Sequence, residues 1–308
     1  MKTAFLFPGQ ASQYVGMGQD LYEKYASARE VFDQANDIMG FDLKKICFEG
    51  PEEELKKTYI TQPAIFVHSV AVFNILQEKG VTFDAAAGHS LGEYSALVAA
   101  GVLSYPDGLR LVKERGRLMY EAGINQPGTM AAIIGLDEDQ VYALCDQVKD
   151  VGIVQPANFN SPGQVAISGE VKAVRAAMEK AKEAGAKKAV ELVVSGAFHS
   201  PLMQAAQEGL KKALEETDFR DAKVPVYSNV EAKPVTDSNQ IRDLLYRQLT
   251  MPVLWQNLIK NMIGDGVART FEVGPGKVLK GLQKRIDRGV PCTEIGTVEN
   301  LENLGEVL

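Results

Sequence analysis

The pattern with the clearest chemistry is Gly88-His89-Ser90-Leu91-Gly92, a G-x-S-x-G sequence. Such a sequence is typical of a sharp turn between a strand and a helix, where glycines allow tight packing and the serine hydroxyl projects outward. A short apolar strand pattern precedes it, and a helical pattern follows it. The N–H groups at the start of that helix, beginning with Leu91, are suited to hold an oxyanion. The sequence therefore predicts that Ser90 is a nucleophile that carries an acyl group.

A serine nucleophile needs a base to take its proton, and the chain has three histidines. His68 lies among apolar residues in a helical pattern, which favours a structural role. His89 adjoins Ser90, but at this kind of turn the preceding side chain points away, so we expect a supporting role. His199 lies in a loop between a strand and a helix, where catalytic groups are often placed. We expect His199 to be the base, with activity falling at about pH 6 to 7 as an unperturbed histidine protonates.

Two regions of the chain differ in the elements that must position these residues. Before about residue 125, a strand at 3–7 ends at Pro8-Gly9, and four helical patterns follow up to about Glu78. The last of these four helices is predicted at 63–79. A strand at 84–88 and helices at 91–101 and 106–121 follow it.

From residue 128 the pattern becomes β-α-β-β-α-β, the ferredoxin-like order. Its strands are predicted at 129–135, 152–158, 163–168 and 187–193, and its helices at 137–149 and 170–184. A helix from about 200, strands near 225–227 and 268–273, and helices near 240–249, 253–263 and 277–287 follow. We predict an α/β fold with a hydrolase-like core, a parallel sheet flanked by helices, formed by 1–125 and 196–308. A small ferredoxin-like domain, residues 126–195, is inserted into it.

Composition limits the partners of the protein. The 308 residues are 45% apolar and 24% charged, with a formal net charge of -7 and a pI near 5.2. A general affinity for nucleic acid or an anionic membrane is therefore not expected. The three cysteines, Cys47, Cys145 and Cys292, are far apart and odd in number, which favours a reducing, cytoplasmic setting without disulfides or a zinc site. We expect no signal peptide, membrane span, metal or cofactor.

Six stretches occur in the order in which one enzyme family carries them, and together they cover nearly the whole chain. They resemble malonyl-CoA:acyl carrier protein transacylase, the loading enzyme of type II fatty acid synthesis. The stretches are Phe7-Pro8-Gly9-Gln10-Ala11-Ser12-Gln13, GHSLGEYSAL at 88–97, Arg115-Gly116-Arg117-Leu118-Met119, NFNSPGQVAISG at 158–169, GAFHS at 196–200 and EVGPGKVLKGL at 272–282.

The resemblance implies roles for individual residues. It implies a Ser90–His199 pair and an oxyanion hole formed by the backbone N–H groups of Gln10 and Leu91. It also implies that Arg115 pairs with the free carboxylate of a malonyl group, and that the main-chain carbonyl of Gln248 orients the histidine. The planar fork of an arginine suits bidentate carboxylate binding. From the residues themselves, a solvated helix charge remains the alternative for Arg115, and a plain strand-ending turn remains the alternative for Gln10.

The implied reaction is ping-pong transfer of malonyl from malonyl-CoA to the phosphopantetheine thiol of acyl carrier protein. GAFHS at 196–200 resembles the malonyl type of this loop rather than the methylmalonyl type. Three alternatives remain: a stand-alone acyltransferase that serves a polyketide synthase, a serine thioesterase or other hydrolase, and a carrier-binding scaffold without chemistry. A hydrolase of this class predicts an acid between nucleophile and histidine in chain order, and none stands in a distinctive loop. The presence of Ser90, His199 and Arg115 argues against an inert scaffold.

Two further groups have a functional and a structural interpretation. Lys277, Lys280, Lys284 and Arg288 share one face by helical spacing and form a candidate docking face for an acidic carrier protein, or simply a solvated face. The preceding Gly274-Pro275-Gly276 lacks the spacing of a phosphate loop. Asn158 and Asn160 flank a strand turn, where they either line the acyl pocket or cap the turn, and capping is favoured.

Overall fold

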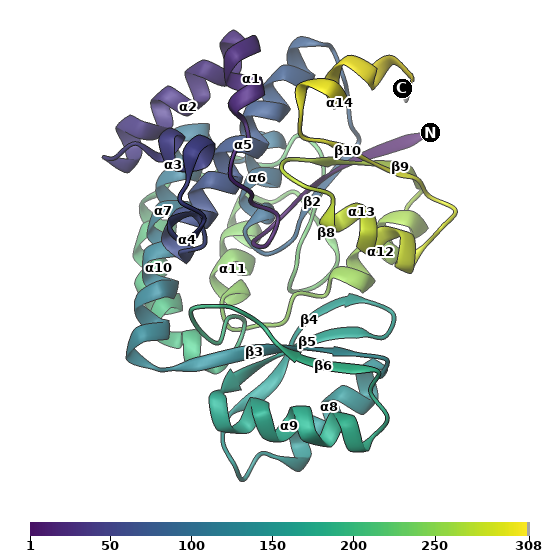
Figure 1. The fold of residues 1–308 in the computed structure, drawn as a ribbon. Helices are drawn as coiled ribbons and strands as arrows, with labels where there is room; N and C mark the ends of the chain where they lie inside the picture. Colours follow the sequence, from purple (N-terminus) through teal and green to yellow (C-terminus); the bar gives the residue numbers. More distant parts are fainter. Residues whose placement is uncertain (307–308) are drawn as a thin grey trace.

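The larger part of the molecule is built on a six-stranded sheet with the order β10-β9-β1-β2-β7-β8 (Figure 1). The computed structural model describes residues 1–306. The strands from β10 to β7 are parallel, and β8 pairs antiparallel with β7. The predicted parallel core is therefore confirmed. Its strands are β1 (Lys2–Phe7), β2 (Ala85–Gly88), β7 (Val226–Tyr227), β8 (Pro234–Val235), β9 (Val267–Val273) and β10 (Cys292–Ile295).

Helices cover this sheet and fill the segments between its strands. Five helices, one more than predicted, lie between residues 19 and 78, because two of them are very short. They are α1 (Gln19–Lys24), α2 (Ala26–Met39), α3 (Leu43–Glu49), α4 (Glu52–Leu55) and α5 (Thr58–Glu78). The later helices of this part are α6 (Gly92–Ala99), α7 (Tyr105–Asn125), α10 (Gln204–Glu216), α11 (Ser238–Gln248), α12 (Trp255–Gly264), α13 (Val278–Ile286) and α14 (Val298–Glu302), with short 3₁₀ turns η1 (Pro201–Met203) and η2 (Asn303–Glu306).

Helix α5 corrects one expectation from the sequence. It starts at Thr58 rather than at 63, holds Pro63 in its interior, and is 21 residues long. An 18-residue window within it has a mean hydropathy of 1.4, so it is long and apolar enough to cross a membrane by length and composition. However, 89% of that window is buried inside the protein. A helix that is apolar all round is also what the core of a large domain requires, and α5 is such a core helix.

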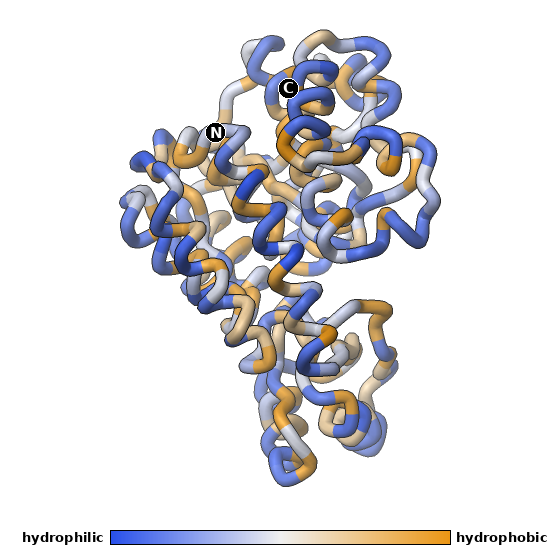
Figure 2. Tube along the Cα trace, turned by 90° about the vertical axis from the view of Figure 1, so that its left-hand side faces the viewer, coloured by the Kyte–Doolittle hydropathy of each residue, from blue (hydrophilic) through white to orange (hydrophobic). Residues whose placement is uncertain are grey.

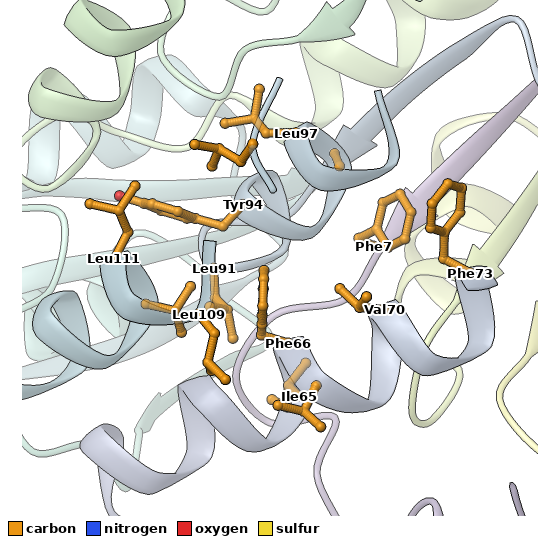
Figure 3. Close-up of a cluster of buried hydrophobic side chains, with 14 of the residues drawn as sticks. Phe7, Ile65, Phe66, Val70, Phe73, Leu91, Tyr94, Leu97, Leu109 and Leu111 are labelled. Atoms are coloured by element: carbon orange, nitrogen blue, oxygen red, sulfur yellow. The ribbon is translucent and has the colours of Figure 1, made fainter. Parts of the chain in front are cut away.

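The core around α5 supports the segment that carries the predicted nucleophile. Figure 3 shows Ile65 and Phe66 of α5 pointing toward the α6 and α7 region, where Leu91, Tyr94 and Leu109 belong to the same buried cluster. The residues that follow Ser90 are therefore held in place by close packing.

The smaller part is a four-stranded antiparallel sheet with the order β4-β5-β3-β6 and two helices on one face (Figure 1). The chain order β-α-β-β-α-β confirms the predicted ferredoxin-like arrangement. The elements are β3 (Gly128–Ile134), α8 (Glu138–Gln147), β4 (Val154–Ser161), β5 (Gln164–Glu170), α9 (Val171–Glu183) and β6 (Lys188–Glu191). The predicted domain, 126–195, encloses all of them, and its boundaries stay a prediction.

The two parts are joined by main-chain pairing as well as by the two chain connections. Val253 N–H donates to the carbonyl of Ala157 over 2.8 Å, and Phe159 N–H donates to the carbonyl of Val253 over 2.9 Å. Strand β4 of the small sheet is therefore fixed in register against the segment between α11 and α12. Figure 2, turned by a quarter, shows the smaller part below the larger one, with hydrophobic and hydrophilic residues alternating along the chain in both.

Candidate active site

The predicted nucleophile lies in a strained turn at the carboxyl end of β2. Ser90 has φ 52°, a left-handed value that is rare for a residue with a side chain. A Cβ on Gly88 would lie 1.8 Å from the backbone carbon of Gly92, and a Cβ on Gly92 would lie 2.0 Å from the carbonyl oxygen of Phe7. Both positions therefore require glycine because the helix α6 packs directly on β1 and β2. This is the geometry expected of the G-x-S-x-G turn.

Ser90 and His199 meet as predicted. The hydroxyl oxygen of Ser90 lies 2.8 Å from Nε2 of His199, and Nδ1 of His199 donates to the main-chain carbonyl of Gln248 over 2.8 Å. This carbonyl fixes the tautomer that leaves Nε2 free to accept the serine proton. His199 also has a left-handed backbone, φ 56°, and its side chain is buried. The arrangement can activate a serine for nucleophilic attack.

Burial changes the acidity expected for His199. Burial, and after it the positive charge of Arg115, lower its pKa from 6.5 to about 3, while the hydrogen bond to Gln248 acts in the opposite direction. The sequence-based expectation of protonation at pH 6 to 7 is therefore wrong, because it treated the imidazole as solvated. A histidine with this pKa stays neutral, and able to act as a base, throughout the mildly acidic range.

Arg115 is fully buried beside the nucleophile, although its neighbour Arg117 is half-exposed on the same helix. Its Nη2 donates to Ser90 Oγ over 3.0 Å and to Gln248 Oε1 over 3.0 Å, and its Nη1 donates to Gln62 Oε1 over 2.6 Å. Among residues 1–306, no carboxylate oxygen lies within 4.0 Å of this guanidinium. The alternative of a solvated helix charge is therefore wrong, and the site contains a buried cation without a carboxylate partner.

The loop after β1 lies against the nucleophile turn. Because β1 and β2 are parallel neighbours, their carboxyl ends meet at one edge of the sheet, where sites form in folds of this type. A Cβ on Gly9 would lie 2.4 Å from the carbonyl oxygen of His89, which shows how closely the two backbones approach. In the part of the chain that the structure describes, the N–H groups of Gln10 and Leu91 have no hydrogen-bond acceptor. Both residues line the cavity at Ser90.

A cavity of about 440 Å³ opens over these groups and is walled by both parts of the molecule. Asn158 and Asn160 of β4 both line it, so the favoured capping role is corrected. Asn160 Oδ1 lies 2.8 Å from Nε2 of His89, which places His89 in the supporting position expected for it. The register of β4 against the 248–253 segment explains why these asparagines face the cavity, and no local pattern in the sequence carries that information.

The predicted docking face is only partly realised. Helix α13 ends at Ile286, so Arg288 lies beyond it and Lys277 lies just before it. Lys280 is paired with Glu294 of β10, while Lys277, Lys284 and Arg288 are exposed. The prediction of one helical face was wrong because it extended the helix at both ends. Docking of a carrier at these exposed cations stays a prediction.

The chain is similar to known proteins along nearly its whole length. The model of the family described as acyl transferase domain matches residues 4–300. A malonyl CoA-acyl carrier protein transacylase of Bacillus subtilis (strain 168) is 47% identical over 302 residues, covering 98% of this chain and 95% of the relative. The chain belongs to the malonyl CoA-acyl carrier protein transacylase family. The resemblance noted from its motifs is therefore confirmed.

Solved structures of this transacylase family have the same fold. An acyl carrier protein S-malonyltransferase from Vibrio cholerae is 43% identical, with a TM-score of 0.96 over 99% of this chain and 100% of the other. A malonyl-transacylase solved in complex with a type II PKS acyl-carrier protein is also 43% identical, with a TM-score of 0.97 and full coverage of both chains. The two-part architecture is therefore that of the transacylase family.

Three buried residues around the transacylase site were not found from the sequence. Asn229, after β7, donates to the carbonyl of Gly88 over 2.7 Å and accepts from the N–H of Ser90 over 2.7 Å, so it braces the strained turn. Glu93 accepts from Gln248 Nε2 over 2.7 Å, and Gln62 accepts from Arg115. Glu93 carried a usable signal, a polar residue in an apolar helical pattern, whereas Gln62 lay just outside the helix predicted at 63–79. Asn229 had no such signal, because its loop reaches the turn through the sheet order.

Proposed function

We propose that this protein transfers the malonyl group of malonyl-CoA to the phosphopantetheine thiol of an acyl carrier protein, through a malonyl ester on Ser90. One observation carries the proposal: the 3.0 Å contact between Arg115 Nη2 and Ser90 Oγ, next to the 2.8 Å contact of Ser90 with His199. A buried cation at the nucleophile suits an acyl group that ends in a carboxylate. It would serve no purpose for an uncharged acyl chain and would disfavour a long apolar one.

In the first half-reaction, His199 Nε2 takes the proton of Ser90 as the hydroxyl oxygen attacks the thioester carbonyl. The oxyanion that forms is held by the N–H groups of Gln10 and Leu91, which have no protein acceptor among the described residues. The carbon–sulfur bond then breaks, and the proton on His199 passes to the departing CoA thiolate. The carboxylate of the resulting malonyl ester pairs with Arg115, for which Nη2 exchanges the serine oxygen for a carboxylate oxygen.

In the second half-reaction, the phosphopantetheine thiol enters through the cavity and gives its proton to His199. Its sulfur attacks the ester carbonyl through the same oxyanion site, the carbon–oxygen bond to Ser90 breaks, and the serine recovers the proton. The main-chain carbonyl of Gln248 holds the imidazolium in place at each stage, a role that needs no acidic side chain. Burial and the charge of Arg115 keep the histidine uncharged between steps by lowering its pKa.

One of the two alternatives is distinguished by a contact of His199. A thioesterase of the α/β-hydrolase class would pair His199 with an acidic side chain, whereas its Nδ1 partner is the Gln248 carbonyl. The polyketide alternative is supported by the similar transacylase that was solved with a type II PKS acyl-carrier protein. The chemistry is the same in both pathways, so the carrier, rather than the site, decides between fatty acid and polyketide synthesis.

A cytoplasmic location, where CoA thioesters and carrier proteins are found, belongs to the same proposal.

The decisive experiment reads which acyl group reaches Ser90. Intact-protein mass spectrometry after incubation with malonyl-, methylmalonyl- or acetyl-CoA should show a malonyl adduct on the native chain and none on Ser90→Ala. Ser95→Ala is the matched control, because the Ser95 hydroxyl is buried on α6, the helix that follows Ser90, without a hydrogen-bond partner among the described residues. A malonyl adduct that persists in Ser90→Ala would overturn the assignment of the nucleophile. Addition of phosphopantetheinylated carrier should then discharge the ester, and discharge by water at the same rate would favour the hydrolase.

A further inference from the structure

Glu93 is a buried carboxyl group without a part in the proposed reaction steps. It lies three residues after Ser90 on α6 and is 3% exposed. Its Oε2 accepts from Gln248 Nε2 over 2.7 Å and from the N–H of Asn229 over 3.3 Å. Desolvation raises its pKa to about 7, against the effect of these two hydrogen bonds and of the charge of Arg115. Burial of a carboxyl group costs free energy, so we expect the contacts of Glu93 to have a function.

The Gln248 side chain links Glu93 to Arg115. Its amide NH₂ group donates to Glu93 and to the carbonyl of Ser90, the latter over 3.0 Å, while its amide oxygen accepts from Arg115 over 3.0 Å. Rotating the amide by 180° would place its oxygen against the carboxylate and the carbonyl, and its NH₂ group against the guanidinium. All the hydrogen bonds would be lost and replaced by repulsive contacts. The Glu93 carboxyl oxygen, together with the Ser90 carbonyl and the guanidinium, therefore favours the orientation that Arg115 needs.

We propose that Glu93 is a positioning residue that orients the Gln248 amide and, through it, holds Arg115 in place for the malonyl carboxylate. The inference rests on the proposed role of Arg115. A relay suits this role better than a direct ion pair would. A carboxylate in direct contact would satisfy the arginine and compete with the substrate, whereas an amide oxygen fixes Nη2 without neutralising its charge. The structure has this separation, since no carboxylate of the described chain lies within 4.0 Å of the guanidinium.

The test compares malonyl with acetyl loading of Ser90 under single-turnover conditions. Glu93→Ala removes one of the two acceptors of the amide NH₂ group and so holds the amide less firmly. The ratio of malonyl to acetyl loading should therefore fall about tenfold, with most of the effect on malonyl-CoA. Glu93→Gln offers an amide oxygen at the same place and should restore most of that ratio. An unchanged ratio in Glu93→Ala, an equal loss of both acyl groups, or no restoration by glutamine would each overturn the proposal.

Two further variants keep the result interpretable. If Glu93→Ala does not fold, Gln248→Met removes the amide but retains the main-chain carbonyl that holds His199, and it should lower the same ratio; an unchanged ratio there overturns the relay. Arg115→Ala separates this inference from the proposed function. A ratio that falls in Arg115→Ala but not in the Glu93 and Gln248 variants would overturn the positioning role of Glu93 and leave the carboxylate-binding role of Arg115 standing. A ratio that Arg115→Ala leaves unchanged removes the carboxylate-binding role itself.

Discussion

Arg115 donates from Nη2 to the hydroxyl oxygen of Ser90 over 3.0 Å, so a buried positive charge touches the predicted nucleophile. This one relationship has two consequences. The charge offers a binding group for a carboxylate carried by the acyl chain, and it lowers the pKa of His199 by Coulomb repulsion. Substrate preference and the state of the base are therefore coupled through the same side chain.

Arg115→Ala should lower kcat/KM for malonyl-CoA by about 100-fold and lower acetyl loading far less, because a charge-assisted carboxylate contact contributes about 1.5 to 3 kcal/mol. Arg115→Lys should recover only part of the loss, since lysine supplies the charge without the planar fork. Rapid-quench assays of acyl loading with malonyl-CoA and acetyl-CoA measure the loss in each variant. Arg117→Ala, two residues along α7, is the control: Arg117 is half-exposed and pairs with Glu114 and Glu121. Equal losses for both esters in Arg115→Ala would make the arginine structural.

The rate of serine acylation should stay nearly constant as the pH falls from 7.5 to about 5. His199 must be neutral to act as a base, and a pKa lowered to about 3 keeps it neutral over this whole window, with the loss expected as the pH approaches that value. In Arg115→Ala the repulsion is removed, so the acid limb of the profile should move to higher pH. Rapid-quench acylation over the pH range measures the acid limb of the wild type and of Arg115→Ala. A wild-type rate that halves near pH 6.5 would mean that the imidazole is solvated.

The same glycine-to-alanine change should have opposite effects at two positions. Gly88→Ala places a Cβ 1.8 Å from backbone atoms of Gly92 and should prevent folding or displace the nucleophile turn. Gly281→Ala, inside α13, meets no atom within 4 Å and should stabilise the protein by up to about 1 kcal/mol through helix propensity. Thermal unfolding and acyl loading of both variants measure the contrast. A folded, active Gly88→Ala protein would contradict the close packing of α6 on β2.

Acid should destabilise the fold, because burial lowers the pKa of all three histidines. Between those lowered values and about 6.5, the unfolded chain binds protons that the folded chain does not, so the free energy of unfolding falls as the pH drops. Glu93 acts in the opposite direction: its pKa is raised to about 7, and its contribution weakens as the pH rises from its ordinary value. The urea midpoint should be lower at pH 5.5 than at pH 7.5. Glu93→Gln should widen this difference, because it removes the opposing contribution. Equal midpoints would contradict the burial of the histidines.

Much of the site was predictable because its signals are local. The G-x-S-x-G turn depends on steric demands within five residues, which is why Gly88, Ser90 and Gly92 occupy the expected geometry. The alternation of strands and helices after residue 128 likewise predicted the second sheet, since hydrophobic periodicity is set by neighbours in the chain. His199 followed from elimination among three histidines. Arg115, Gln10 and Gln248 needed the resemblance to a family, because nothing near them in sequence marks them.

Tertiary structure decided what those side chains experience. Sequence placed Arg115 on a helix, but only packing against α5, α6 and α11 buries it and surrounds it with uncharged oxygens. The pKa of His199 is likewise a property of its surroundings, which is why the estimate for a solvated histidine failed. Asn229 meets the nucleophile turn through the order of β2 and β7 in the sheet, and Glu93 meets Gln248 through the approach of α11. Local patterns determine which residues are present and which elements they form, whereas long-range packing determines solvation, charge and partners.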